Sequence, residues 1–188
     1  MLVTSLTSVQ GQNTYTLKSV SASVSGTSTL HAWESDVTKV DCKGVFEVSN
    51  NTLKTIRDVE VKIPVEGIKS KEGKIMDSKT YEAFKYEENP FILYKTKTAE
   101  VVAQGGTAII KTKGNLTMAG TTREVELDGN WKLLANGDLE VDVSKSLKMT
   151  DYNMTPPTAV LGTIKVGDEV TIKIKLTLTA SNISKSKS

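Results

Sequence analysis

The sequence predicts an all-β protein of about eight antiparallel strands with one short helix. The first observation is apolar and polar alternation with a period of two, which is typical of a half-buried strand. In VEVKIPV (59–65) every second side chain is apolar, while Glu60 and Lys62 fall on the other face. EVTIKIKLTLTA (169–180) repeats this alternation over a longer span. The second observation is turn chemistry between such segments, which favours antiparallel neighbours.

The remaining expected strands lie before and between these two. The first is a stretch rich in serine and threonine, SVSASVSGTSTLHAW (19–33). The others are FILYKTKTAEVV (91–102), TAIIKTKGNLTM (107–118), VELDGNWKL (125–133) and LEVDV (139–143).

Glycine pairs supply the predicted reversals of the chain. Asn136-Gly137 is the strongest signal, because both residues tolerate positive φ and favour a tight hairpin. Gly105-Gly106, Asp128-Gly129 and Gly167-Asp168 predict further reversals or bulges.

One segment departs from the strand pattern. In SKTYEAFKYEENP (78–90), Tyr81 and Phe84 join Met76 on a short helical face. Ser78 is expected to cap the start of this helix, and Pro90 resets the chain after it.

A sheet of this length hides its edges by closing on itself or by folding over. We therefore expect a barrel, with a sandwich as the alternative. An eight-stranded barrel is either filled by its own side chains or just wide enough for one slender ligand.

The composition limits the function. The 188 residues suit one domain, and 24 Lys and Arg against 22 Asp and Glu leave a net charge of +2 with no basic cluster, so no nucleic acid partner is expected. The single cysteine, Cys42, gives no disulfide framework. No run approaches the roughly 18 apolar residues of a membrane span, so no transmembrane segment is predicted.

We divide the chain into three parts. Residues 1–13 are either disordered or the remnant of an export signal, because a small-residue junction is present but a basic leading segment is missing. Residues 14–180 form the β domain, and residues 181–188 form a solvated tail.

The stretch around the only histidine leaves one question open. In a continuous strand the two faces would carry alternate residues, and a bulge at Gly26 would exchange them. One face holds Ser25, Thr27, Thr29, His31 and Trp33, and the other holds Val24, Gly26, Ser28, Leu30 and Ala32.

Five segments carry a resemblance to a known family. They are GTSTLHAWES (26–35), VEVKIPVEGIKS (59–70), KIMDSKTYEAFKYEENPFILYK (74–95), GNLTMAGTTREVEL (114–127) and LKMTDYNMTPPTAVLGTIKVGDEVTIKIKL (147–176). In this order, over roughly residues 14–180, the sequence resembles the YceI-like family of bacterial polyisoprenoid-binding proteins. Family members often have an acidic residue where this chain has Ala32, which puts a polar contact at that position in doubt.

The resemblance implies an extended lipocalin-like barrel with an elongated apolar cavity. Such a cavity accepts an isoprenoid chain, for example a quinone tail or a prenyl phosphate. The resemblance also implies export to the periplasm or secretion, which adds weight to the export-signal interpretation of residues 1–12, and dimers are common in such families.

A prenyl chain needs a dry tunnel with few polar groups at its mouth. The candidate lining residues are Val24, Leu30, Phe84, Phe91, Leu93, Met118, Met149 and Met154. Trp33 and Tyr152, which are apolar with a polar edge, are candidates for the mouth. Each of these residues is equally compatible with an ordinary place in the core of a β protein.

His31 has two interpretations. It either hydrogen-bonds a ligand headgroup at the mouth or is held in the barrel wall by a neighbouring backbone carbonyl, and we favour the second. It lacks the histidine and cysteine company of a metal site.

No catalytic motif is present, since the chain has neither a G-x-S-x-G elbow nor a phosphate-binding glycine loop. The expected function is therefore binding of an isoprenoid or similar amphiphile for carriage, storage or sensing, without catalysis and without a cofactor besides the bound lipid. The alternative is a structural or interaction module whose barrel is filled by its own side chains.

Overall fold

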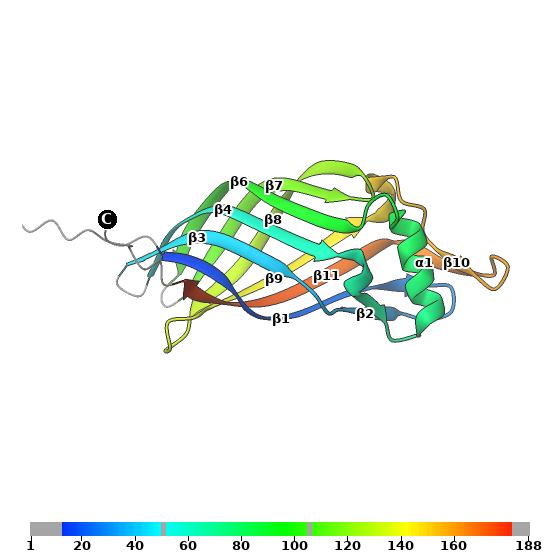
Figure 1. Cartoon of the computed structure of the whole chain (residues 1–188), viewed down its shortest axis with the longest axis horizontal. Helices are drawn as coiled ribbons and strands as arrows, with labels where there is room; N and C mark the ends of the chain where they lie inside the picture. The colour runs from blue at the N-terminus through cyan, green and yellow to red at the C-terminus, as the bar shows by residue number, and fades with distance from the viewer. Residues whose placement is uncertain (1–12, 50–51, 105–106, 182–188) are drawn as a thin grey trace, which may run out of the picture.

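The computed structural model describes residues 13–49, 52–104 and 107–181, and within them the chain forms a closed eight-stranded antiparallel barrel (Figure 1). Each strand hydrogen-bonds to the next around the wall, and the last pairs with the first. The order is β1 (Asn13–Ser28), β11 (Ile164–Ser181), β9 (Leu139–Lys148), β8 (Thr121–Leu133), β7 (Thr107–Met118), β6 (Phe91–Gln104), β4 (Thr52–Pro64) and β3 (Asp41–Ser49). The predicted barrel is confirmed.

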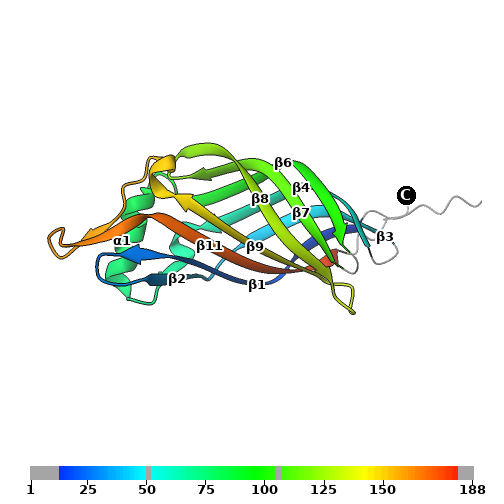
Figure 2. The same cartoon turned by 180° about the vertical axis from the view of Figure 1, so that it is seen from behind.

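The other elements gather at one end of the barrel (Figures 1 and 2). The helix α1 (Lys74–Phe84) lies across this end, opposite the end at which β11 finishes. The short strands β2 (Trp33–Val37) and β5 (Ile68–Ser70) extend the sheet beside β1, and β10 (Thr158–Ala159) pairs with β11. Two 3-10 turns, η1 (Val65–Gly67) and η2 (Met149–Tyr152), complete the fold.

The helix begins earlier than predicted. Its cap position is Gly73, whose φ of 90° is open to glycine and costly for other residues. The Ser78 hydroxyl instead donates to the carbonyl of Lys74, 3.1 Å away, inside the first turns. The predicted Ser78 cap is therefore wrong, because the glycine allows the chain to enter the helix one turn sooner.

The expected strand 19–33 is two strands joined by a turn. β1 ends at Ser28, whose hydroxyl donates to the carbonyl of His31 (2.8 Å) and accepts from the His31 N–H (3.1 Å). The chain then returns so that Trp33 pairs with Gly26. A Cβ on Gly26 would lie 2.7 Å from the indole ring of Trp33, so this close approach requires glycine.

The face of β1 that points inward is settled by a bulge at Lys18. The register against β11 shifts between Leu17 and Ser19, and the Lys18 ammonium reaches the nearly buried Asp138 carboxylate at 2.5 Å. Before the bulge the odd-numbered residues pack on the core, and after it the even-numbered residues do. The inward residues are Tyr15, Leu17, Val20, Ala22 and Val24.

The structure confirms some of the predicted turns and not others. Gly137, at φ 85°, donates its N–H to the carbonyl of Leu134 (2.9 Å), which confirms a reversal between β8 and β9. Gly167 lies where β11 bulges against β1. Asp128-Gly129 lies within β8 and reverses nothing, because both of its neighbouring strands continue past it. Residues 105–106 lie outside the described residues.

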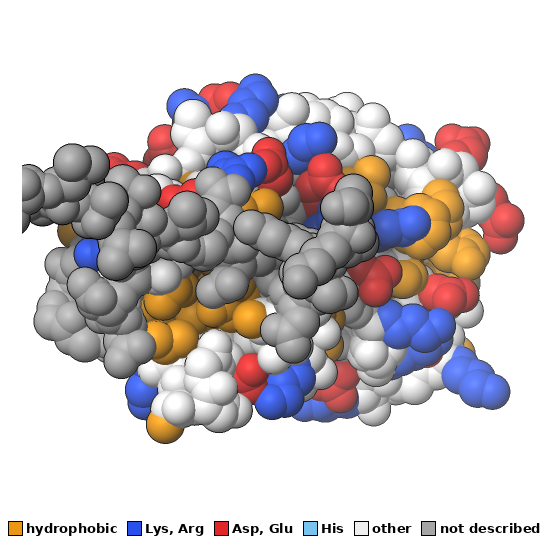
Figure 3. Space-filling view, turned by 60° about the vertical axis from the view of Figure 1, so that its left-hand side comes forward, with side chains coloured by type: hydrophobic (Ala, Val, Ile, Leu, Met, Phe, Trp, Pro, Cys, Tyr) orange, Lys and Arg blue, Asp and Glu red, His pale blue; other side chains and the backbone are white. Residues whose placement is uncertain are grey.

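The outer surface carries interspersed charges of both signs, with small apolar areas between them on the face shown in Figure 3. Neighbouring strands share carboxylates: Glu60 lies within 3.0 Å of both Lys43 and Lys95. Such exposed pairs stabilise the fold little, but they keep the outer rows of lysines matched with acid. None of the helices in the described part of the chain is long and apolar enough to cross a membrane.

Candidate functional site

The barrel interior holds an apolar cavity of about 240 Å³. An apolar cavity of roughly 150 Å³ is already large enough to bind benzene. The lining on β11 extends from Val166 to Leu178, which corresponds to roughly 40 Å along a strand. Each of the eight wall strands contributes inward-facing side chains to the lining, for example Val61 on β4 and Leu116 on β7. The space is long, narrow and apolar.

The helix α1 forms the floor of the cavity at one end. Met76, Thr80, Ala83 and Phe84 line it from one face of the helix. Phe84 is the buried residue of α1 and packs on the barrel core.

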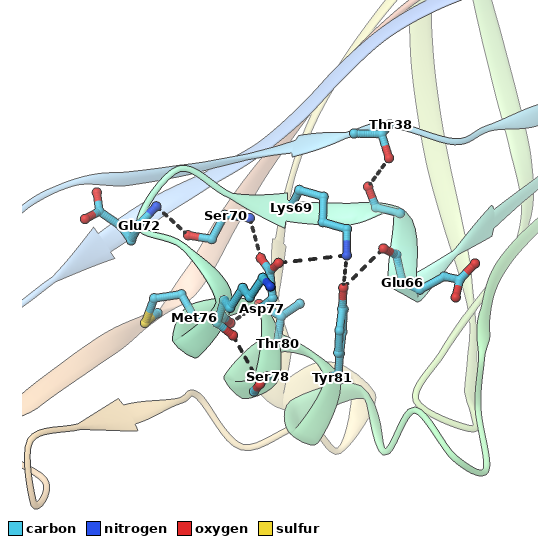
Figure 4. A network of polar contacts seen from close by, with 12 residues as sticks. Thr38, Glu66, Lys69, Ser70, Glu72, Met76, Asp77, Ser78, Thr80 and Tyr81 are labelled. Carbon is cyan, nitrogen blue, oxygen red and sulfur yellow. Dashed lines mark hydrogen bonds and ion pairs between the residues drawn. The ribbon is translucent and has the colours of Figure 1, made fainter.

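Polar contacts hold α1 against the η1–β5 segment (Figure 4). The Asp77 carboxylate accepts a hydrogen bond of 2.7 Å from the Ser70 backbone N–H. The Lys69 ammonium donates to the Tyr81 hydroxyl (2.6 Å), which in turn donates to the Glu66 carbonyl (3.1 Å). The hydrogen bond to Tyr81 is the main cause of the raised pKa of Lys69. Together these contacts fix the helix over the end of the barrel.

The wall is incomplete between β8 and β9. The two strands pair only where Gly129–Leu133 faces Leu139–Val143, and beyond these rows they separate toward the end where α1 lies (Figure 2). We call this region, from 121 to 128 on β8 and from 144 to 148 on β9, the seam. The cavity lining continues along it through Lys145 and Leu147 to Lys148, whose side chain is exposed.

The turn η2 bridges the wide end of the seam. The Asn153 side chain, directly after η2, donates to the Thr121 hydroxyl of β8 at 3.1 Å. On the other side the Asp168 carboxylate of β11 accepts from the Thr150 N–H (2.9 Å) and the Thr150 hydroxyl (2.6 Å). These bonds from Thr150 hold the pKa of Asp168 below its usual value.

On β6 and β7, next to β8, the wall pairs some of its buried polar groups, although the Thr96 hydroxyl of β6 is buried without a partner among the described residues. The Tyr94 and Thr112 hydroxyls are 2.8 Å apart, and Thr112 donates to the Leu127 carbonyl at 2.9 Å. Cys42 also lines the cavity, and burial raises the pKa of its thiol to about 11. The thiol is therefore neutral near pH 7 and behaves as a small apolar group.

Six of the residues proposed from the sequence border the cavity together. They come from β1, β2, α1, β7, η2 and the segment after η2, and they are Val24, Trp33, Phe84, Met118, Met149 and Met154. Contact with a ligand stays a prediction for each of them.

The other five lie elsewhere. Leu30 and His31 are exposed on the turn after β1, where the His31 Nδ1 lies 2.7 Å from the Ala32 carbonyl. Phe91 and Leu93 point outward from β6, with the Lys62 ammonium 3.7 Å from the Phe91 ring centroid. Tyr152 is 1% exposed but is not part of the lining. Leu30, Phe91, Leu93 and Tyr152 therefore do not line the cavity as expected, and contact of these residues or His31 with a ligand stays an untested prediction.

Sequence reasoning missed several lining residues. Tyr94 and Thr112 carry the polar contact inside the wall, and Lys145 and Lys148 bring charge to the seam. A signal for Lys145 was present, because it continues the inward alternation of Val141 and Val143. Within the described residues, no group of three or more His, Cys, Asp or Glu is placed to hold a metal ion.

Comparisons with solved structures place this barrel among known folds. Burkholderia cenocepacia BcnA matches with a TM-score of 0.66 at 16% identity, covering 85% of this chain and 96% of that one. A polyisoprenoid binding domain from Saccharophagus degradans, implicated in plant cell wall breakdown, matches with a TM-score of 0.67 at 11% identity, covering 89% and 98%. A Campylobacter jejuni YceI protein matches at 0.54 and 17%, covering 77% and 85%.

These identities establish a shared fold. The comparison with curated proteins gives no match. The family model described as YceI-like domain matches residues 8–178, nearly the whole chain. The chain therefore belongs to the YceI-like domain family.

Proposed function

We propose that this protein binds an isoprenoid or a similar long-chain amphiphile inside the barrel and carries, stores or senses it without catalysing a reaction. The observation that supports this most directly is the long apolar cavity described above. An extended hydrocarbon chain buries its surface fully only in a tunnel of this shape, and removing that surface from water supplies the binding free energy. The polyisoprenoid binding domain from Saccharophagus degradans, which shares this fold, supports the same ligand class.

The alternative, a barrel filled by its own side chains, fits the interior less well. Side chains from every wall strand point into the interior, yet they leave a space of about 240 Å³ between them. Core packing normally leaves few voids larger than one water molecule. A space of this size therefore favours a barrel that holds a ligand over a barrel filled by its own side chains.

The first test is native mass spectrometry of the protein purified from a bacterial host, followed by organic extraction and identification of any released lipid. Near-stoichiometric release of an isoprenoid is expected. Absence of a bound lipid, together with no uptake of added prenyl phosphates or quinones, would contradict the proposal.

A paired substitution on α1 tests the location. Ala83→Trp places an indole in the cavity floor and is expected to lower affinity for a prenyl ligand at least 10-fold, because the ligand and the indole compete for one space. Glu82→Trp, one residue away on the exposed side of the helix, is the matched control and should bind as wild type. Equal binding by both variants, with unchanged melting temperatures, would place the ligand elsewhere.

The proposal includes an exported protein, in the periplasm or secreted, and self-association as a dimer. Both come from the family resemblance of the sequence. Osmotic-shock fractionation of the native host tests the first, and sedimentation equilibrium tests the second. Recovery with cytoplasmic markers would refute export, and a monomer at micromolar concentration would refute the dimer.

A further inference from the structure

Lys145 occupies an unusual place for a charged residue. It lies on β9 opposite Ile172 of β11, and directly opposed residues share a face of the sheet. Ile172 lines the cavity, as do Val143 and Leu147 on either side of Lys145 in its own row. The Lys145 side chain thus belongs to the inward row at the seam.

The charge of the cavity has one sign. Among the described lining residues the charged groups are Lys145 and Lys148, and no carboxylate lines the cavity with them. Outside the lining, the Asp168 carboxylate of β11 lies close enough to Lys148 for the lysine charge to help lower the Asp168 pKa. None of the described residues gives Lys145 a hydrogen bond or an ion pair. On the outer face, by contrast, Lys175 lies within 3.2 Å of Glu140 and 3.8 Å of Asp142.

An ammonium in an apolar surrounding is costly unless an anion or water compensates it. The seam gives that ammonium access to the surface, and the four-carbon stem covers apolar wall. An amphiphile with its tail in the cavity would bring its head to the same seam. A phosphate oxygen there would form a charge-assisted hydrogen bond with Lys145.

We propose that Lys145, assisted by Lys148, selects amphiphiles with an anionic phosphate or diphosphate head over neutral ones such as prenyl alcohols and quinones. This inference rests on the proposed function, since it assumes that the tail occupies the cavity. It assigns the head to the seam between β8 and β9 and the tail to the space beneath it.

The test compares three probes with one tail: geranylgeraniol, geranylgeranyl monophosphate and geranylgeranyl diphosphate. Binding is measured by calorimetry and followed by tryptophan fluorescence, to which Trp33 in the cavity lining and Trp131 both contribute. Wild type should bind the diphosphate at least about 10-fold more tightly than the alcohol, and this ratio should fall as salt is added.

Lys145→Met keeps the apolar stem and removes the charge. It should bring the affinity for the diphosphate to within about 3-fold of the affinity of the same variant for the alcohol. Lys145→Arg keeps the charge and should restore the preference. Lys173→Met, on the outward row of the adjacent strand β11, is the matched control and should keep the wild-type ratio.

The outcomes separate the two proposals. If wild type binds none of the probes, the proposed function fails. If wild type binds all three probes equally, or if Lys145→Met still prefers the diphosphate, the cavity binds lipid but Lys145 does not select the headgroup. Inorganic diphosphate is the last probe: if it binds wild type as tightly as the prenyl diphosphate, the seam is a site for a free anion and the inference is overturned.

Discussion

The wall formed by β6 and β7 and the seam between β8 and β9 are built from similar strands but differ in how completely they pair. β6 and β7 stay paired from Leu93 to Gln104, with one irregularity near Thr96. β8 and β9 pair over five rows and then separate. The wall of the same barrel is therefore continuously paired between β6 and β7 and only partly paired between β8 and β9.

The polar groups follow this difference only in part. In the wall of β6 and β7 the hydroxyl of the buried Tyr94 has the Thr112 hydroxyl as its partner. At the seam, Lys145 has no partner among the described residues. Close to the seam, the Tyr152 hydroxyl on η2 is buried without a partner in the described part of the protein. Unmatched groups are not confined to the seam, because the Thr96 hydroxyl on β6 and the Trp131 indole N–H on β8 are also buried without partners in the described part of the protein.

The largest expected difference is in the free energy of unfolding, and it comes from one glycine in β7 and one in β8. A Cβ on Gly114, in β7, would lie 2.5 Å from the Lys95 carbonyl and 2.8 Å from the Tyr94 ring. A Cβ on Gly129, at the start of the seam, would lie 3.1 Å from the Val143 side chain. Gly114→Ala should lower the free energy of unfolding by roughly 2–3 kcal/mol, because backbone cannot give way, and Gly129→Ala by at most about 1 kcal/mol.

Chemical denaturation of both variants measures this contrast. In a chain of this size each kcal/mol corresponds to roughly 2–4 °C in melting temperature, so a thermal scan gives an independent check. Equal losses at the two glycines would mean that the wall is no more tightly packed than the seam.

The hydroxyls of two buried tyrosines, Tyr94 and Tyr152, give the next contrast. Tyr94→Phe removes the hydrogen bond to Thr112 and should cost about 1 kcal/mol of unfolding free energy. Tyr152→Phe removes a hydroxyl that has no partner among the described residues, and it should be neutral or stabilise by up to about 1 kcal/mol. Denaturation curves of the two variants test this, and a clear loss for Tyr152→Phe would reveal a bridging water at η2.

The barrel itself was predictable because alternation is a local property of each strand. VEVKIPV and EVTIKIKLTLTA each show which residues point inward, and β4 and β11 follow them. The turn at 29–32 was not predicted, because the serines and threonines that lead into it, from 19 to 29, fit a strand as well as a turn. What decides between them is the pairing of Gly26 with Trp33 across the turn, which alternation does not encode.

The prediction of which β6 residues line the cavity failed for a related reason. Both rows of FILY are apolar, so the first four residues do not distinguish Phe91 and Leu93 from Ile92 and Tyr94. Lys95 and Lys97 continue the row of Phe91 and Leu93, which is the signal for an outward face. Extending the alternation to these lysines would have identified Tyr94 as inward.

The seam lay beyond any pattern in the sequence. Where two strands stop pairing depends on the curvature of the whole barrel and on the bridge that η2 makes between β8 and β11. Lys145 could be assigned to the inward row from its spacing, but its lack of a partner follows from the separation of β8 and β9.

The smallest expected effect concerns the pH dependence of that bridge. Hydrogen bonds from Thr150 lower the pKa of Asp168, so the ionised carboxylate favours the folded state. This contribution is fully present above the unfolded carboxyl pKa of about 4 and is lost as pH falls through the lower folded pKa. Asp168→Asn should therefore melt slightly below wild type at pH 7, and the gap should close in acid. Asp151→Asn, on the exposed side of η2, is the matched control and should track wild type at each pH. A gap that persists unchanged at the acid limit would show that Asp168 acts through its shape and not its charge, leaving the bridge across the seam independent of pH.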